Sequence, residues 1–212
     1  MKGEWVRHDL LALVQGTPRR VLSLGCGTCA TEVHLQQAGA EVIGIDVSAE
    51  AVAVANQRIH KAMVADVEKD ALPELQPQSF DLVLCGDVLE HLRFTEHVLA
   101  RLHGWLADGG ALIVSVPNAT HYTVVRELVF RRNWRYEAGG LFDRGHYRLF
   151  TKKSLLRLLG EQSFVVEEVT SIRSMTPKMR PVWWLLRPLM FVLPFLEEYF
   201  VQNWTVRARV KR

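Results

Sequence analysis

The chain has 212 residues, 49% of them hydrophobic and 23% charged, which suits one sizeable α/β domain and is too short for two. Its net charge of +3 is too small for a dedicated nucleic-acid-binding protein, so we expect no nucleic-acid partner. Three cysteines give no disulfide framework, and the charged N-terminus lacks the apolar core of a signal peptide. These features argue against a secreted disulfide scaffold and favour a cytoplasmic protein.

Strand-like and helix-like segments alternate over the first 116 residues. The predicted strands are 21–24, 41–46, 62–66, 80–85 and 110–116. The predicted helices between them are 28–38, 48–58 and 94–107. Alternation of this kind predicts a parallel sheet with helices on both faces.

The pattern changes in the second half of the chain. An Arg- and aromatic-rich stretch at 118–150 leads to Thr151, which predicts the N-cap of a short helix. Segments 164–172 and 201–210 alternate as strands should, and an apolar segment at 181–199 separates them. No linker-like composition divides the chain, so we expect a single domain over 1–212, with 118–150 as an insertion.

The sequence GCGTCA at residues 25–30 contains two overlapping patterns. Cys26 and Cys29 form a C-x-x-C pair between a strand and a helix, where a dithiol redox site would lie. Gly25 and Gly27 instead allow a tight turn and a close approach of the backbone to a ligand at the strand end. The redox interpretation leaves the glycines unexplained.

Acidic residues end the next two predicted strands. Asp46 lies about twenty residues after the glycines, where a carboxylate accepts hydrogen bonds from both ribose hydroxyls. Asp66 closes the third strand, where its carboxylate is placed to accept from an adenine amino group. The glycine interpretation therefore explains more of the sequence than the cysteine interpretation does, although the loop alone suits a dinucleotide equally well.

The order of LSLGCGT, VIGIDVS, ADVE, FDLVLCGDVLEHL and LADGGALIVSVPN resembles the class I S-adenosylmethionine-dependent methyltransferases. Within them the chain is most similar to the ubiquinone-biosynthesis O-methyltransferases and to small bacterial glycan and natural-product methyltransferases. The resemblance implies a Rossmann-like, doubly wound α/β sheet of seven strands, of which the last two form an antiparallel hairpin. It implies S-adenosylmethionine as the cofactor.

Site residues are carried over from the same resemblance. The implied cofactor-binding residues are Gly25, Cys26, Gly27, Asp46, Val47, Asp66, Val67 and Gly86. Two positions depart from the family pattern, which usually has an acid at Ser23 and a third glycine at Cys29.

Two histidines are candidates for the base that removes the acceptor proton. Asp87, Glu90 and His91 are spaced i, i+3 and i+4, which predicts one helix face able to hold Mg²⁺ or another divalent cation, or to present His91 as the base. The resemblance associates a similar motif with a divalent metal in ubiquinone-type relatives, although many members have Glu-His without one. His146 is the second candidate base.

Partners are predicted from two local patches. Around His146, arginines outnumber acids, which favours an acidic acceptor if these arginines are not merely solvated. The arginines are Arg126, Arg131, Arg132, Arg135, Arg144 and Arg148, and the acids are Glu127, Glu137 and Asp143. The apolar segment 181–196 is too interrupted to span a bilayer and suits a packing helix, a lid, a homodimer surface, or peripheral membrane contact with a lipid-linked acceptor.

The sequence as a whole predicts an S-adenosylmethionine-dependent methyltransferase that forms an O-methyl product on a small molecule or glycan. The alternatives are a dithiol redox protein and a methyltransferase-like domain that binds the cofactor without catalysis.

Overall fold

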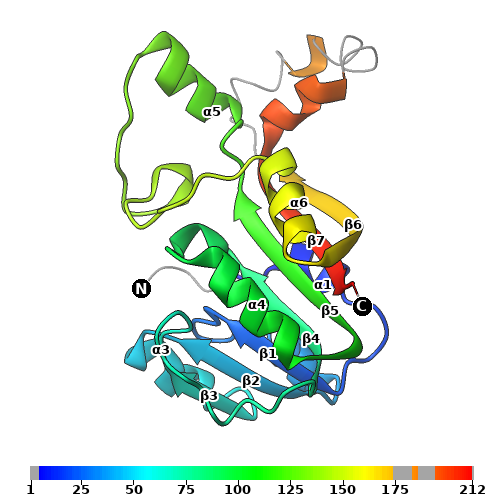
Figure 1. Ribbon diagram of the computed structural model, residues 1–212. Coiled ribbons are helices and arrows are strands. Elements are labelled where there is room, and N and C mark those ends of the chain that lie inside the picture. The colour runs from blue at the N-terminus through cyan, green and yellow to red at the C-terminus, as the bar shows by residue number, and fades with distance from the viewer. Residues whose placement is uncertain (1–4, 174–182, 186–193, 212) are drawn as a thin grey trace.

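The computed structural model describes residues 5–173, 183–185 and 194–211. Seven strands form one sheet in the order β3-β2-β1-β4-β5-β7-β6, which confirms the predicted fold. The strands are β1 (Arg20–Leu24), β2 (Glu41–Asp46), β3 (Lys61–Val64), β4 (Phe80–Gly86), β5 (Leu106–Pro117), β6 (Phe164–Arg173) and β7 (Val201–Val210). The first five run parallel, and β7 pairs antiparallel with both β5 and β6 (Figure 1).

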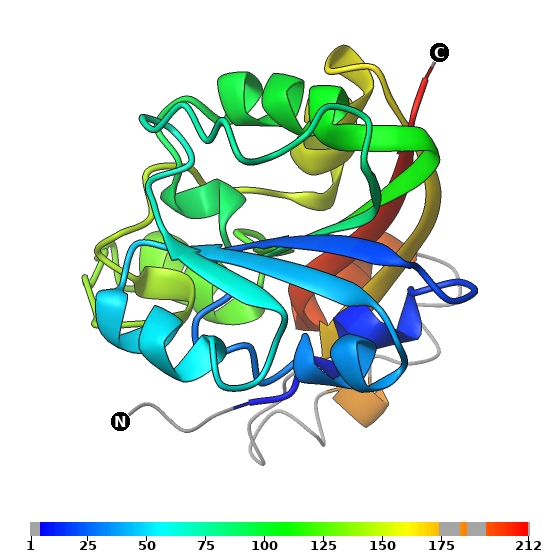
Figure 2. The same ribbon diagram turned by 90° about the horizontal axis from the view of Figure 1, so that it is seen from below.

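Helices cover both faces of this sheet. Helices α1 (His8–Ala12), α2 (Val33–Gln37) and α3 (Ala49–Ala55) lie on one face, and α4 (Thr95–Trp105) and α6 (Lys152–Glu161) lie on the other (Figure 2). Alternate residues of β4 point to opposite sides, so that Leu84 packs with α1 to α3 and Val83 packs with α4 and α6. Burial on both faces explains the nearly continuous apolar runs of the strands.

Some element boundaries differ from those predicted. The helix predicted over 28–38 is only Val33–Gln37, because the preceding residues form turns in which Cys29 has a φ of 57°. The third strand ends at Val64 instead of at residue 66. The fifth strand begins at Leu106, four residues earlier than predicted.

The stretch 118–150 follows β5 and contains three short helical elements. These are α5 (Tyr122–Val125), the π-helical turn η2 (Arg126–Phe130) and η3 (Gly140–Phe142). In Figure 1, α5 stands away from the sheet beyond the carboxyl end of β5. The chain returns to the sheet where Phe150 bridges Asn118.

Most of the apolar segment predicted at 181–199 lies outside the described residues. Its described parts are 183–185 and the 3-10 helix η5 (Pro194–Phe200). Within the described ranges, no helix combines the length and the hydropathy needed to cross a membrane.

Candidate active site

A cavity of about 740 Å³ opens at the carboxyl ends of β1, β2, β3 and β4. This is the edge at which open α/β sheets bind ligands. Five of the predicted cofactor residues line the cavity, namely Gly25, Asp46, Val47, Asp66 and Val67.

A second cavity of about 240 Å³ adjoins the first at Gly25, and we call it the tail cavity. The other three predicted cofactor residues, Cys26, Gly27 and Gly86, line it together with Arg7 and Glu32. All eight predicted cofactor residues therefore lie along one continuous stretch of surface.

The conformation of the glycine loop favours residues without a side chain. Gly25 has a φ of 60°, and a Cβ atom there would lie 2.5 Å from a methyl carbon of Val88. Gly27 has a φ of 53° and donates its N–H to the Asp46 carboxylate at 2.8 Å. The second Asp46 oxygen accepts from the Ser48 N–H at 2.9 Å. This carboxylate thus fixes the loop while facing the cavity, an arrangement that fits a nucleoside with free ribose hydroxyls.

Asp66 lines the same cavity just after the end of β3. Its carboxylate accepts from the Lys69 ammonium at 2.5 Å and from the Glu68 N–H at 2.9 Å. The hydrogen bond from Lys69 lowers the pKa of Asp66, so the side chain is an ionised acceptor at neutral pH.

The cysteines of the glycine loop are buried. The neighbouring Cys29 thiol, together with burial, raises the pKa of the Cys26 thiol. A dithiol redox site needs the opposite, a stabilised thiolate that is partly exposed. Cys26 instead packs against β2. Its sulfur lies so close to Gly44 that a Cβ atom added to Gly44 would be 2.6 Å from it. The geometry therefore argues against the dithiol interpretation.

His91 and His146 lie together although 55 positions separate them. Their ring centroids are 4.8 Å apart. The Nδ1 atom of His91 is 3.0 Å from the carbonyl oxygen of Gly145, so Nδ1–H donates to this carbonyl and Nε2 takes no part in the contact. Burial, and secondarily the nearby His91, lower the pKa of His146, which is therefore neutral at pH 7.

These histidines line a third cavity of about 210 Å³, which we call the histidine cavity. Its other polar lining residues are Asp87, Glu90, Asp143, Gln202 and Asn203. Asp87 and His91 also line the large cavity. The two spaces therefore meet at these two side chains.

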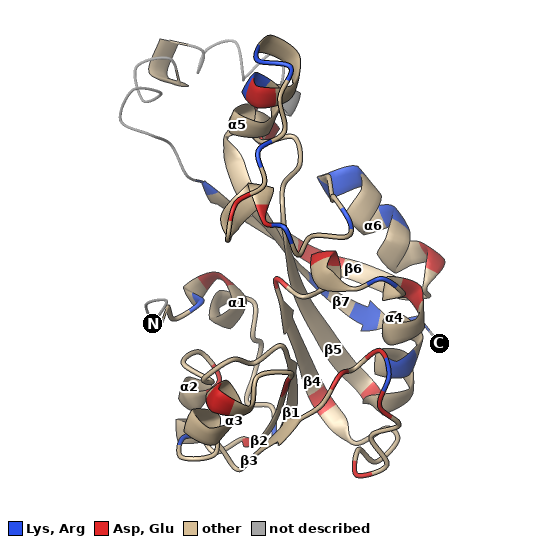
Figure 3. Ribbon diagram, turned by 90° about the vertical axis from the view of Figure 1, so that its left-hand side faces the viewer, with Lys and Arg blue, Asp and Glu red and all other residues tan. Residues whose placement is uncertain are grey.

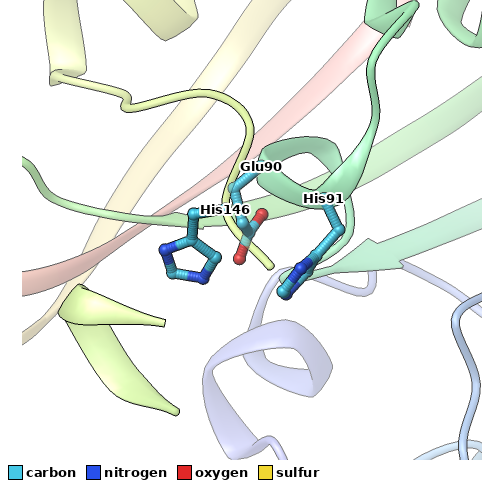
Figure 4. A group of neighbouring side chains, drawn as sticks. All are labelled: Glu90, His91 and His146. Atoms are coloured by element: carbon cyan, nitrogen blue, oxygen red, sulfur yellow. The ribbon is translucent and has the colours of Figure 1, made fainter. Parts of the chain in front are cut away.

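The prediction that Asp87, Glu90 and His91 share one helix face is wrong. The strand β4 runs into a 3-10 turn of only three residues, Leu89–His91, and Asp87 precedes it with a φ of 55°. The three groups that gather are instead Glu90, His91 and His146, whose ligand atoms lie within 4.8 Å of one another (Figure 4). Chain reversal between β5 and α6 brings His146 into the group.

Asp87 points into a different set of contacts. Its carboxylate forms an ion pair with Arg7 and accepts from the Ser115 hydroxyl at 2.8 Å and from the Asn203 amide at 2.9 Å. Arg7 is itself held by both oxygens of Asp9 at 2.8 Å. Sequence reasoning missed the three partners of Asp87, since no local pattern joins residues that lie 28 to 116 positions apart.

Glu90, unlike Asp87, is buried without hydrogen-bond partners among the described residues. It is 1% exposed, and neither carboxylate oxygen has a hydrogen-bond partner among the described residues. Burial raises the pKa of Glu90 well above its usual value, and the nearby Asp87 charge adds to the increase. A carboxyl group without partners beside two imidazoles can receive or share a proton, or bind a cation with them.

Many of the predicted acceptor-binding arginines are paired within the chain. Arg126 and Arg131 donate to the buried Glu127 carboxylate at 3.0 and 2.9 Å, and Arg135 lies 3.7 Å from it. Figure 3 shows basic and acidic segments side by side in the part of the chain that carries α5. Arg148 pairs with Glu96 at 2.7 Å. These pairs give the arginines a structural role, and the acidic acceptor stays a prediction.

Comparison with solved structures supports the fold. A methyltransferase from Mesorhizobium loti, described as S-adenosylmethionine dependent, has a TM-score of 0.65 and 21% identity over 95% of this chain and 96% of that one. The magnesium protoporphyrin IX methyltransferase from Synechocystis, solved with bound S-adenosylhomocysteine, has a TM-score of 0.62 and 19% identity over 97% of this chain and 80% of that one.

Sequence comparison identifies the family. The ubiquinone biosynthesis O-methyltransferase of Albidiferax ferrireducens is 30% identical over 131 residues, 59% of this chain and 50% of that protein. The one from Paracidovorax citrulli is 34% identical over 119 residues, 54% of this chain and 48% of that protein. The chain thus spans about half the length of the curated relatives that it matches. The profile of the family described as "Methyltransferase domain" matches residues 4–169, and with the sheet order and the glycine loop this places the chain in the class I S-adenosylmethionine-dependent methyltransferase family.

Proposed function

We propose that this chain transfers a methyl group from S-adenosylmethionine to an oxygen atom of a small-molecule or glycan acceptor. The observation that carries the proposal is the meeting of the large cavity and the histidine cavity at Asp87 and His91. One cavity has the residues for a nucleoside cofactor, and the other has two imidazoles that can face an acceptor hydroxyl. The O-methyltransferase names of the curated relatives support oxygen as the acceptor atom.

The chain's contribution to this chemistry is binding, orientation and proton removal. Asp46 would accept hydrogen bonds from the ribose hydroxyls of the cofactor, and Asp66 would accept from its adenine amino group. The cofactor supplies an already activated methyl group on a sulfonium. His91 and His146 line the space where the acceptor hydroxyl would lie, and one of them takes its proton through a free ring nitrogen.

A divalent cation held by Glu90, His91 and His146 is the alternative route to the same reaction. Two imidazole nitrogens and a carboxylate oxygen form a recognised ligand set for transition metals. A bound cation would lower the pKa of an acceptor hydroxyl and make a separate base unnecessary. An acidic or lipid-linked acceptor, a homodimer and a peripheral membrane contact are compatible with either route.

Both routes predict that substitution of the histidines lowers the rate of methyl transfer. Formation of S-adenosylhomocysteine is measured by mass spectrometry with a panel of phenols, sugars and carboxylic acids, and then as a single-turnover rate with the best acceptor. His91→Ala and His146→Ala are each compared with His97→Ala, an exposed residue of α4. Loss of the general base should lower the rate by about 10²–10⁴-fold, while His97→Ala keeps the parent rate.

Chelation separates the base from the metal. Under the base route, a chelator leaves the rate unchanged, whereas under the metal route it abolishes turnover until Mg²⁺ or another divalent ion is restored. If the chain binds S-adenosylmethionine but no acceptor in the panel yields S-adenosylhomocysteine, a cofactor-binding domain without catalysis is the better description. Parent rates in both histidine variants, with no effect of chelation, would refute both routes.

A further inference from the structure

An acid absent from β1 is supplied by a neighbouring segment. Ser23 occupies the position on β1 where the family pattern leads one to expect an acid. The Ser23 hydroxyl donates to the Glu32 carboxylate at 2.7 Å, and both side chains are buried. Glu32 therefore brings a carboxylate to the end of β1 from the turn that precedes α2.

Glu32 also lines the tail cavity, which continues from the large cavity at Gly25. Gly27 and Gly86 form other parts of its wall. The N-terminal segment closes the far side, where the Arg7 N–H donates to the Thr31 hydroxyl at 3.0 Å. A ligand whose nucleoside occupies the large cavity would extend its remaining atoms into this space.

The charges around the tail cavity favour a cation near Glu32. Glu32 is the one carboxylate among the described residues that line it. The facing guanidinium of Arg7 is already committed to Asp9, Asp87 and Ser115. Burial raises the pKa of Glu32 above its usual value, although the Ser23 hydroxyl and the backbone N–H groups of Glu32 and Thr31 act in the opposite direction, so the ionised form lacks full compensation. An ammonium group in the cavity would provide it.

We propose that Glu32 binds the α-ammonium group of the cofactor's amino-acid tail, in place of the acid missing at Ser23. This inference rests on the proposed function, because it takes S-adenosylmethionine as the ligand. The competing role for Glu32 is purely structural, as a brace between β1 and the glycine loop.

Two ligands distinguish these roles without any turnover. S-adenosylhomocysteine carries the amino-acid tail, and 5′-methylthioadenosine has the same nucleoside without it. Calorimetry measures both affinities for the parent chain, for Glu32→Gln, and for Glu161→Gln, which makes the same charge change on the exposed end of α6. Glu32→Gln should bind S-adenosylhomocysteine about 10- to 100-fold more weakly, the usual value of a charged hydrogen bond. Its affinity for 5′-methylthioadenosine, and both affinities of Glu161→Gln, should stay at the parent values.

If Glu32→Gln folds poorly, a variant with the carboxylate moved from position 32 to position 23 tests the same proposal. The double variant Ser23→Asp, Glu32→Ser returns the carboxylate to β1 and should regain most of the affinity for S-adenosylhomocysteine that the single variant Glu32→Ser loses. Equal weakening of both ligands in the Glu32 variants would establish the structural role and overturn the proposal, as would unchanged binding of S-adenosylhomocysteine. If the parent chain binds neither ligand, the proposed function itself fails.

Discussion

Asp87 and Glu90 are two carboxylates three positions apart, and the fold gives them opposite chemistry. The Asp87 carboxylate forms an ion pair with Arg7 and accepts hydrogen bonds from Ser115 and Asn203. Glu90 is buried beside Asp87 without a partner, which stabilises the neutral form. A buried carboxyl group with a raised pKa that lines a cavity is typical of functional sites. The sequence pattern alone does not distinguish Asp87 from Glu90.

The stability of a Glu90→Gln variant tests this burial. Because the pKa of Glu90 is raised in the folded state, its carboxyl supports folding below about pH 4.5 and loses that contribution as pH rises through the folded pKa. Gln does not titrate. The free energy of unfolding of the variant, relative to that of the parent chain, should therefore be higher at pH 8 than at pH 4. An increase of about 1 kcal/mol in this difference corresponds to roughly 2–4 °C in Tm at this chain length. Thermal unfolding of the parent and the variant at both pH values measures it.

Asp87→Asn is the matched control for this measurement. It removes the charge that pairs with Arg7 and should lower the Tm at pH 8. A Glu90→Gln advantage that is equal at the two pH values, or greater at pH 4, would show that the folded protein does not hold Glu90 neutral.

At the scale of elements, α6 forms from local signals and α2 does not. Thr151 accepts from the Ser154 N–H at 3.2 Å, and the Ser154 hydroxyl accepts from the Thr151 N–H at 2.9 Å, which satisfies two backbone donors. The buried leucines of α6 recur with the helical period, at Leu155, Leu158 and Leu159. In contrast, α2 has no side-chain cap and begins only after the turns that shape the glycine loop.

Removal of the α6 cap should have a measurable cost. Thr151→Ala leaves the Ser154 N–H without its side-chain acceptor and should lower the free energy of unfolding by about 1 kcal/mol (range about 0.5–2). Lys153→Ala, at an exposed position of the same helix, should change it by less than about 0.5 kcal/mol. Urea titration of both variants measures the difference. Equal effects would mean that the cap contributes nothing specific.

At the scale of the molecule, segments from both ends of the chain meet on the sheet. Asp9 accepts from the Thr205 hydroxyl at 2.7 Å, and Arg207 donates to the Leu13 carbonyl at 3.2 Å. Asn203, on β7, reaches Asp87 after β4. The site is therefore complete only when the whole sheet has formed, and ligand binding should be linked to global stability.

Cofactor-dependent stabilisation measures this linkage. S-adenosylhomocysteine at 100 times its Kd should stabilise the parent chain by about 2.7 kcal/mol, or roughly 5–10 °C in Tm. Asp46→Ala removes charged acceptors for the ribose and should weaken binding by about 1.5–3 kcal/mol, so most of the shift is lost at the same ligand concentration. Glu50→Ala, an exposed substitution on the following helix, should retain the full shift. An undiminished shift in Asp46→Ala would remove Asp46 from the cofactor site.

The sequence by itself predicted the parallel part of the sheet and the edge of the sheet at which the large cavity opens. Strands and helices were predicted from apolar periodicity and Gly25 from the need for an open backbone, and both are local properties. Asp46 and Asp66 followed because the carboxyl ends of parallel strands meet at one edge, once the strands are known. These inferences need no knowledge of side-chain contacts.

Only the tertiary structure decided which side chains work together. His146 replaces Asp87 beside Glu90 and His91, Asp87 pairs with Arg7, and Glu32 accepts a hydrogen bond from Ser23. The backbone turn at Asp87 and the return of the chain after α5 fix these partners, and neither leaves a periodic signal in the sequence. Hydrogen bonds and pKa values depend on contacts of a few ångströms between segments that folding alone brings together.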